Sequence, residues 1–418
     1  MSNQTISRNV VTTPINVSNQ AISRYRVQSI DVLRGIVMVI MALDHVRDFF
    51  FKVDIGNAAT VATDPTNMAT TTPALFFTRW ITHFCAPVFV FLSGASAFLI
   101  GQKKTKSQLS AFLISRGIWL VLVEWFIITL GWTFDPLYHI FILQVIWAIG
   151  VSMVILGFLV YLPVPIIFLI GCIIVFGHNL TNYGFASQLK GNVFADLAYF
   201  GVFKVNSISA SRFFIIVYSF LPWTGMMLLG YCMGKIYTSG FDPGRRKRIL
   251  RLTGLALVLL FLVLRFTNWY GDPEPWSAQP RGPVFTFLSF LNVNKYPPSL
   301  LFACMTIGPA LILLSGIEKI RNWFTEIMNV YGRVPMFYYI IHFYIIHTLV
   351  VILFYITGHG SKDIVTPNNI FLFRPSDLGF GLPGVYLVWI FVVVVLYPLC
   401  KRYDRYKSTH TYWWLKYI

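Results

Sequence analysis

Charge is scarce in this sequence. Asp, Glu, Lys and Arg make up 12% of its 418 residues, whereas hydrophobic residues make up 56% and the mean hydropathy is +0.66. Soluble domains carry about 25% charged residues, so the composition excludes a soluble globular protein and predicts a chain embedded in a membrane. Aromatic residues, at 17%, suit a helical bundle with side chains anchored at the lipid interface.

Cysteine is also scarce, and the cysteines are not paired in the pattern that metal sites use. They lie in or beside apolar segments without a C-x-x-C pair: Cys85, Cys172, Cys232, Cys304 and Cys400. The sequence therefore indicates neither a disulfide framework nor a zinc site, and we expect no metal. The apolar stretches are continuous rather than alternating, which excludes a transmembrane barrel and predicts an all-α bundle.

Ten apolar segments are long enough to cross a bilayer. They cover roughly residues 30–51, 76–100, 109–131, 139–160, 163–177, 213–234, 249–267, 298–316, 334–356 and 383–399. We expect one transmembrane domain over 30–400, followed by a cytoplasmic tail over 401–418. Residues 1–29 have no apolar core and are rich in Ser, Asn, Thr and Val, so they are predicted to form a disordered cytoplasmic tail.

The positive charges set the orientation. With the N-terminus inside, the inner segments hold twenty Lys and Arg and the outer loops hold eight, and an even number of spans returns the C-terminus to the cytoplasm. The net charge of +17 is therefore mainly a topology signal. The basic run Gly244–Arg248 fits a cytoplasmic loop in contact with anionic lipid. Nucleic-acid binding is the weaker interpretation, and we expect none.

Ionisable side chains inside a span cost about 2.5–3.5 kcal/mol each at the helix centre. In the first span, Asp31 and Arg34 are three residues apart and share a face near its inner end. They form either a local ion pair at the interface or a brace at the inner mouth of a site. His45 follows Asp31 by 14 residues, about 21 Å at 1.5 Å per residue. Asp48, one turn beyond, can orient its imidazole, whereas Asp44 points about 100° away.

The next two spans bring further ionisable groups to the depth of His45. Arg79 and His83, four residues apart in the second span, share one face, and Glu124 reaches a similar height in the third. A single membrane histidine is more often a packing residue. The convergence of five groups from three helices makes a catalytic cluster an equally good interpretation.

The ninth span adds two more histidines. His342 can meet Tyr338 on one face of the helix, and together they are candidates for an acceptor site. His347 lies five residues beyond His342 and faces elsewhere, so a structural role is favoured for it.

Two motifs in the first spans resemble the membrane acyltransferase family three. They are Asp31-x-x-Arg34-Gly35 followed by His45, and Phe89-Val90-Phe91-Leu92-Ser93-Gly94. In that family a histidine at the end of helix one is catalytic. Only Arg116 stands at the foot of the third span, where these acyltransferases commonly have two arginines.

Later stretches resemble a sister family, the heparan-α-glucosaminide N-acetyltransferase catalytic-domain proteins. These stretches are Ile142-Leu143-Gln144-Val145, Pro222-Trp223-x-Gly225, Gly230-Tyr231-x-x-Gly234-Lys235 and Gly332-Arg333-Val334-Pro335-x-Phe337-Tyr338-Tyr339-x-x-His342. The lysosomal enzyme of that family carries its active histidine just before the second span. The corresponding stretch here, 70–73, has no histidine.

The resemblance implies an acyltransferase of the bacterial inner membrane. Acetyl-CoA would be a co-substrate on the cytoplasmic side, with no permanently bound cofactor, and the acceptor would be a sugar hydroxyl or amine of an outer glycan or glycolipid. His45 would act as general base or as nucleophile, held by Asp48 or Glu124. Arg79 would stabilise the oxyanion or orient the thioester, and His83 is the alternative to His45.

Other residues are assigned to the two substrates. Positive charge for the donor's phosphates comes from Lys103, Lys104, Lys106 and Arg116. The assigned donor-binding residues are Asp31, Arg34, Arg116 and Gln144. The acceptor candidates are His342, Tyr338 and Trp276, the last in an outer loop over 268–297 whose tryptophans are equally well explained as interfacial anchors. The main rival is a transporter or flippase that uses the intramembrane charges as a substrate or proton path. A non-catalytic scaffold would leave these charges unexplained.

Overall fold

The computed structural model describes residues 27–55, 58–61, 64–183, 187–365 and 370–416. The tail predicted over 1–29 lies almost wholly outside these residues, and its last two positions already belong to the first helix. That helix, α1 (Gln28–Phe50), starts two residues before the predicted first span.

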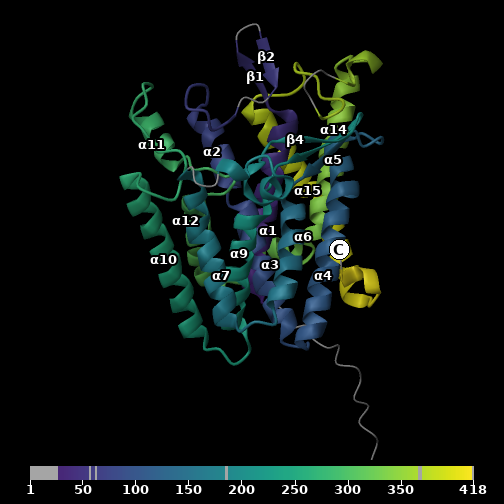
Figure 1. Ribbon diagram of the computed structural model, residues 1–418. Helices are drawn as coiled ribbons and strands as arrows, with labels where there is room; N and C mark the ends of the chain where they lie inside the picture. Colours follow the sequence, from purple (N-terminus) through teal and green to yellow (C-terminus); the bar gives the residue numbers. More distant parts are fainter. Residues whose placement is uncertain (1–26, 56–57, 62–63, 184–186, 366–369, 417–418) are drawn as a thin grey trace, which may run out of the picture.

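The described chain is a mostly helical bundle, as the sequence predicted (Figure 1). Seven continuous helical segments are long and apolar enough to cross a membrane: 73–101, 106–133, 164–182, 243–267, 300–317, 335–356 and 382–409. The first two segments are α2 (Pro73–Thr82) with α3 (Cys85–Gly101), and α4 (Lys106–Leu122) with α5 (Thr129–Thr133). The other five are α7 (Val164–Gly177) with the turn η2 (His178–Tyr183), α10 (Pro243–Thr267), α12 (Leu300–Ile317), α14 (Pro335–Ile356) and α15 (Leu382–Thr409). The chain is thus a multi-pass membrane protein. The count of ten spans and the side of each terminus stay predictions.

Two predicted spans were wrong at their outer ends. The segments predicted to start at 139 and 213 begin as the strands β3 (Ile140–Leu143) and β5 (Arg212–Ile216), and their helices α6 (Val145–Leu159) and α9 (Phe220–Met233) start later. β5 pairs in parallel with β3 and antiparallel with β4 (Val205–Ser209). A short apolar run does not distinguish a strand from a buried helix, so the pairing of two runs distant in sequence decided the outcome.

The second and third predicted spans are interrupted helices. The second consists of α2 (Pro73–Thr82) and α3 (Cys85–Gly101), which meet at a turn at His83 and Phe84. Pro87 lacks the N–H that would bond to the carbonyl of His83, which favours a break there. The third consists of α4 (Lys106–Leu122), the π-helical turn η1 (Val123–Ile128) and α5 (Thr129–Thr133).

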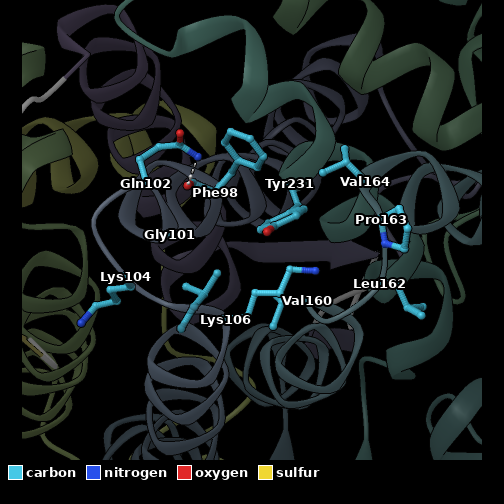
Figure 2. Close-up of a pocket in the computed structure, with 11 residues that line it drawn as sticks. Phe98, Gly101, Gln102, Lys104, Lys106, Val160, Leu162, Pro163, Val164 and Tyr231 are labelled. Atoms are coloured by element: carbon cyan, nitrogen blue, oxygen red, sulfur yellow. Dashed lines mark hydrogen bonds between the residues drawn. The ribbon is translucent and has the colours of Figure 1, made fainter.

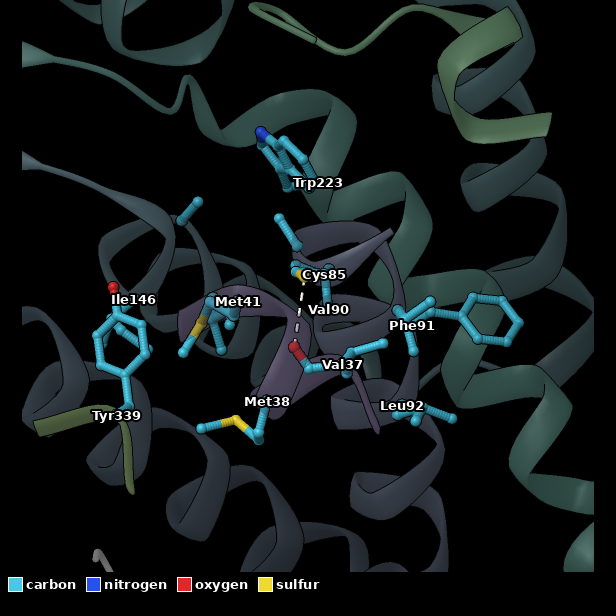
Figure 3. Packing of buried hydrophobic residues seen from close by; sticks show 14 of the residues in the cluster. Val37, Met38, Met41, Cys85, Val90, Phe91, Leu92, Ile146, Trp223 and Tyr339 are labelled. Carbon is cyan, nitrogen blue, oxygen red and sulfur yellow. Dashed lines mark hydrogen bonds between the residues drawn. The ribbon is translucent and has the colours of Figure 1, made fainter. Parts of the chain in front are cut away.

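α1 runs through the middle of the bundle and packs against α13 (Trp323–Arg333) at very close range. A Cβ atom on Gly35 would lie 1.8 Å from the carbonyl oxygen of Met328, and one on Gly332 would lie 1.7 Å from the carbonyl oxygen of Asp31. Only glycine permits this approach of two backbones. Further along α1, Met38 and Met41 belong to the buried core, where the Cys85 thiol donates to the carbonyl of Val37 (Figure 3).

The strands and several of the short helices gather at one end of the bundle (Figure 1). There the hairpin of β1 (Lys52–Ile55) and β2 (Ala58–Val61) and the helix α11 (Pro283–Leu291) lie beyond the ends of the long helices. The remaining short helices are α8 (Val193–Ala195), η3 (Ser187–Leu189), η4 (Asp196–Phe200), η5 (Gly234–Tyr237), η6 (Ser361–Asp363) and η7 (Trp413–Lys416). By the predicted orientation, the end with the strands is the outer end.

Candidate active site

One elongated cavity of about 970 Å³ follows α1 through the bundle. Its lining extends along this helix from Val27 to His45, which is about 27 Å at 1.5 Å per residue. Side chains from α3, α4 and α6 form its other walls: Phe89, Ser93, Ser96, Leu113, Arg116, Ile149 and Met153. The cavity therefore connects Asp31 and Arg34, near one end of α1, with Asp44 and His45, near its other end.

The inner mouth of the cavity is basic. Four cations line it: Lys103, Lys104, Arg333 and Lys407. Arg116 lines the cavity further in, ten residues beyond the start of α4 at Lys106. Asp31 and Arg34 also line this end and form an ion pair at 2.9 Å. Arg34 donates in addition to the Ser96 hydroxyl at 2.8 Å and to the carbonyl of Gly332 at 3.4 Å. The pair thus ties α1 to α3 and to the end of α13, the geometry expected of a brace at the mouth.

A second, smaller pocket of about 310 Å³ adjoins this mouth (Figure 2). It shares Gln102 and Lys104 with the large cavity. Its own wall includes Lys106, whose ammonium donates to the carbonyl of Tyr161 at 2.6 Å, and the ring of Tyr231. Lys106, expected among the donor's phosphate contacts, therefore lies beside the mouth rather than in it.

The middle of the cavity is apolar and the outer end is polar. Met38, Met41 and Met153 line the middle. The outer end is lined by Asp44, His45, Thr82, Gln144, Tyr218 and Lys295. Gln144, which was assigned to donor binding, precedes α6 and so lies at the end of the cavity that holds His45.

His45 is packed among aromatic rings. Its ring centroid lies 4.5 Å from that of Phe343, 5.0 Å from that of Trp132 and 5.3 Å from that of His342. Its Nδ1 is 3.8 Å from the carboxylate of Asp48 and has no hydrogen bond within the described part of the chain. Asp48 is thus the acid placed to orient the imidazole, from one turn further along the same helix.

Asp44 takes part in the site, although the sequence predicted that it points away. It lines the cavity beside His45 and accepts two hydrogen bonds from Arg79, at 2.7 and 2.5 Å. Arg47 contacts Asp44 at 2.9 Å and Asp48 at 2.5 Å. Two arginines and two aspartates therefore form a neutral network behind the imidazole, in which Arg79 is engaged by Asp44.

Glu124 and His83 lie outside the cavity lining. Glu124 is fully buried, and its carboxylate accepts the backbone N–H of Trp147 at 2.9 Å, in the first turn of α6. A carboxylate at this position caps a helix N-terminus, so Glu124 is engaged there rather than with His45. The buried His83 packs its ring against Phe302, with centroids 5.4 Å apart.

The other candidates occupy two different environments. His342 and Tyr338 stack, with centroids 5.6 Å apart, and His342 Nδ1 lies 2.5 Å from the carbonyl of Tyr339. Both lie behind His45 and outside the cavity lining, so they are not placed to meet an acceptor. Trp276 packs against Phe290 in the outer loop, with centroids 5.7 Å apart.

His347 has the environment of a structural residue. Its two ring nitrogens lie 3.1 Å and 3.0 Å from the carbonyls of Gly131 and Leu372. Both ring nitrogens therefore have a backbone partner, and His347 ties α14 to α5 and to the loop before α15.

The sequence analysis missed Lys295 and Tyr218, which line the outer end of the cavity, and assigned no role to Tyr296, which packs beside Lys295. The ammonium of Lys295 lies 5.0 Å from the ring centre of Tyr296 and 5.9 Å from that of Tyr218. Burial raises the pKa of the Tyr296 phenol, but the cations of Lys295 and Arg79 outweigh burial, so this pKa lies below its usual value. Lys295 and Tyr296 lie in a long outer connection that gave no periodic signal, although Tyr296 ends the aromatic-rich loop over 268–297. Tyr218 falls within the segment predicted as a span over 213–234 and lies between β5 and α9.

Comparison with known families identifies a match. The sequence model of a family described as "Heparan-alpha-glucosaminide N-acetyltransferase, catalytic" matches residues 26–264, more than half of the chain. The matched part contains α1, α3, α4 and α6, which form most of the cavity wall, and it ends before Lys295. Comparison with curated proteins finds no significant match.

Proposed function

The chain belongs to the heparan-alpha-glucosaminide N-acetyltransferase catalytic family, a family of transmembrane acetyltransferases, and from this membership we propose a specific reaction. The protein takes an acetyl group from acyl-CoA in the cytoplasm and transfers it to a sugar hydroxyl or amine on the outer side of the membrane. The membrane is the bacterial inner membrane.

The observation that carries the proposal is the shape and polarity of the cavity along α1. A basic mouth suits the phosphates of coenzyme A. Lys103 and Lys104 line this mouth, and Arg116 lines the cavity further in. The apolar middle suits an extended pantetheine arm. His45 lines the outer end of the cavity, which the thioester of a donor bound in this way would reach. The donor's phosphates would then stay at the inner mouth while its thioester reaches the acceptor at the outer end. Neither substrate would have to cross the membrane.

The proposed chemistry is acyl transfer with His45 as general base. His45 takes the proton of the acceptor as its nitrogen or oxygen attacks the thioester carbon. The carbonyl electron pair moves to oxygen, then returns as the carbon–sulfur bond breaks. The sulfur leaves as coenzyme A and receives the proton from His45. Asp48, whose carboxylate lies 3.8 Å from Nδ1, stabilises the protonated imidazole through its charge, and Nε2 takes the proton.

The test uses the purified protein with acetyl-CoA labelled in the acetyl group and glucosamine as acceptor. The proposal expects free coenzyme A in equal amount to acetylated sugar. A transporter or flippase would move a substrate and leave the thioester intact. Labelled donor that stays intact, with any acceptor tried, would contradict the proposal.

The sidedness is tested with sealed membrane vesicles. Acetyl-CoA does not cross a bilayer, so inside-out vesicles, which expose the cytoplasmic mouth, should use added donor. Right-side-out vesicles should use it only after permeabilisation. Equal use by both types of intact, sealed vesicle would overturn the assigned orientation of the cavity.

A further inference from the structure

The charges at the outer end of the cavity do not balance. Arg79 and Arg47 are engaged by Asp44 and Asp48, which leaves the network of four side chains neutral. Lys295 is a fifth charged group, 6% exposed, and it lines the same end of the cavity. Among the described residues, no carboxylate lies within ion-pair distance of it.

Two aromatic rings partly compensate the charge of Lys295. Its ammonium lies over Tyr296 and Tyr218, at 5.0 and 5.9 Å from the ring centres. Such contacts stabilise a cation by about 0.5–2 kcal/mol, and they do not neutralise it. A buried ammonium without an anion is costly, so a position of this kind suits a negative charge that arrives during the reaction.

The loop that carries Lys295 is firmly held. The buried carboxylate of Asp272 accepts the N–H of Asn294 at 2.9 Å and the hydroxyl of Ser299 at 2.6 Å. Arg265, at the outer end of α10, donates to the carbonyls of Phe290 and Ser289, each at 2.9 Å. These contacts fix both sides of the loop, as a preorganised electrostatic role requires.

Lys295 is also linked to His45 through a short series of contacts. Its neighbour Tyr296 accepts from Arg79 at 3.4 Å, Arg79 binds Asp44, and Asp44 precedes His45 in α1. His45, on α1, and Lys295, in the loop before α12, both line the cavity. A thioester between them would have the base on one side and the cation on the other.

We propose that Lys295 is a further catalytic residue, which stabilises the oxyanion formed on the thioester carbonyl. This inference rests on the proposed function and assigns to Lys295 the role that the sequence gave to Arg79. When the acceptor attacks, the carbonyl electron pair moves to oxygen, and the ammonium of Lys295 donates a charge-assisted hydrogen bond to it. When the carbonyl reforms and the carbon–sulfur bond breaks, this interaction is released. Lys295 keeps its proton throughout.

The experiment compares two donor analogues that differ in one charge. S-carboxymethyl-CoA places an anion where the oxyanion forms, and S-carbamoylmethyl-CoA is its neutral isostere. Their dissociation constants are measured by displacement of labelled acetyl-CoA from the full-length protein. The parent should bind the anionic analogue roughly tenfold or more tightly than the neutral one, the effect expected of a buried charge-assisted bond.

Variants assign this preference to Lys295. Lys295→Met should bring the ratio of the two constants to about one, and Lys295→Arg should retain most of it. Lys190→Met, which removes an exposed lysine of another outer loop, is the matched control and should keep the parental ratio. In turnover, Lys295→Met should lower kcat by a hundredfold or more, with little change in the KM for acetyl-CoA.

The possible failures are distinguishable. Equal affinity of the parent for both analogues, or a preference that survives in Lys295→Met, would overturn the oxyanion role and leave the proposed function standing. If neither analogue displaces acetyl-CoA, or acetyl-CoA does not bind, the donor assignment fails together with the inference. If Lys295→Met does not fold, Lys295→Gln takes its place, and its ratio of the two dissociation constants is compared with that of the parent.

Discussion

The guanidinium of Arg79 on α2 donates to both carboxylate oxygens of Asp44 on α1, at 2.7 and 2.5 Å. The pair joins two helices behind the outer end of the cavity, and both side chains are largely buried. Its geometry is that of a structural brace. It holds the end of α1 that carries His45, and it occupies the guanidinium that the sequence analysis assigned to the oxyanion.

Arg79→Met should therefore destabilise the protein more than it impairs the chemistry of molecules that remain folded. Removing one member of a buried ion pair typically costs about 3–5 kcal/mol, because the other charge is left without its partner. We expect a clear fall in the unfolding temperature in detergent, measured by fluorescence or size-exclusion assays. The double variant Asp44→Asn with Arg79→Met should recover much of the loss. A stable Arg79→Met protein with abolished turnover would instead return Arg79 to the catalytic group.

Gly35→Ala should disrupt the packing of α1 against α13. The added Cβ would lie 1.8 Å from the carbonyl oxygen of Met328, so the two backbones must separate. We expect a loss of at least about 2 kcal/mol, above the middle of the usual range for overpacking, measured as a lower unfolding temperature. Gly316→Ala is the control, because a Cβ there meets no atom within 4 Å. An unchanged unfolding temperature for Gly35→Ala would contradict the close contact.

Much of the fold was predictable because apolar length alone identifies membrane helices. The long spans fall where the sequence placed them, since a bilayer requires the same run of apolar residues whatever the neighbours are. The starts of the segments at 139 and 213 were not predictable. Their short apolar runs satisfy their backbone groups by pairing with each other, and no local pattern records such a partner.

The candidate site shows the same division. The spacing within α1 correctly places Asp31 with Arg34, and it brings Asp48 beside His45, because one helix fixes these relations. Contacts between different elements were harder to predict from the sequence. Glu124 has the expected depth, yet a π-helical turn directs it to the start of α6. Lys295 comes from an irregular loop, whose path is set by buried contacts rather than by periodicity.

Arg116→Ala should weaken binding of acyl-CoA. Arg116 lines the cavity ten residues beyond the inner start of α4, where it would contact a phosphate of the donor. The expected loss is about 1.5–3 kcal/mol if the charge-assisted bond is shielded from water, measured as the dissociation constant of acetyl-CoA. Arg248→Ala, which changes an exposed arginine near the start of α10, should bind the donor like the parent. Equal affinity in Arg116→Ala would remove Arg116 from the donor site.

Cysteine labelling should confirm the orientation of the bundle. Ser277 and Ser239 are exposed in loops at opposite ends, so Ser277→Cys and Ser239→Cys are mild replacements at accessible positions. In intact cells a membrane-impermeant thiol reagent should label Ser277→Cys and spare Ser239→Cys until the membrane is opened. The parent, with its five native cysteines, gives the background. Labelling in the reverse order would invert the predicted topology.

His45→Ala should abolish acetyl transfer and leave the protein folded. The imidazole lines the cavity, and its Nδ1 has no hydrogen bond within the described chain, so its removal enlarges an existing space and strands no hydrogen-bond partner there. General base catalysis is typically worth 10²–10⁴-fold, and we expect turnover to fall at least about a hundredfold while acetyl-CoA still binds. His83→Ala, outside the cavity lining, should keep most of its turnover. If His45→Ala keeps more than a tenth of parental turnover, with folding confirmed by size exclusion, His45 is not the base. A simultaneous collapse in His83→Ala would then assign that role to His83.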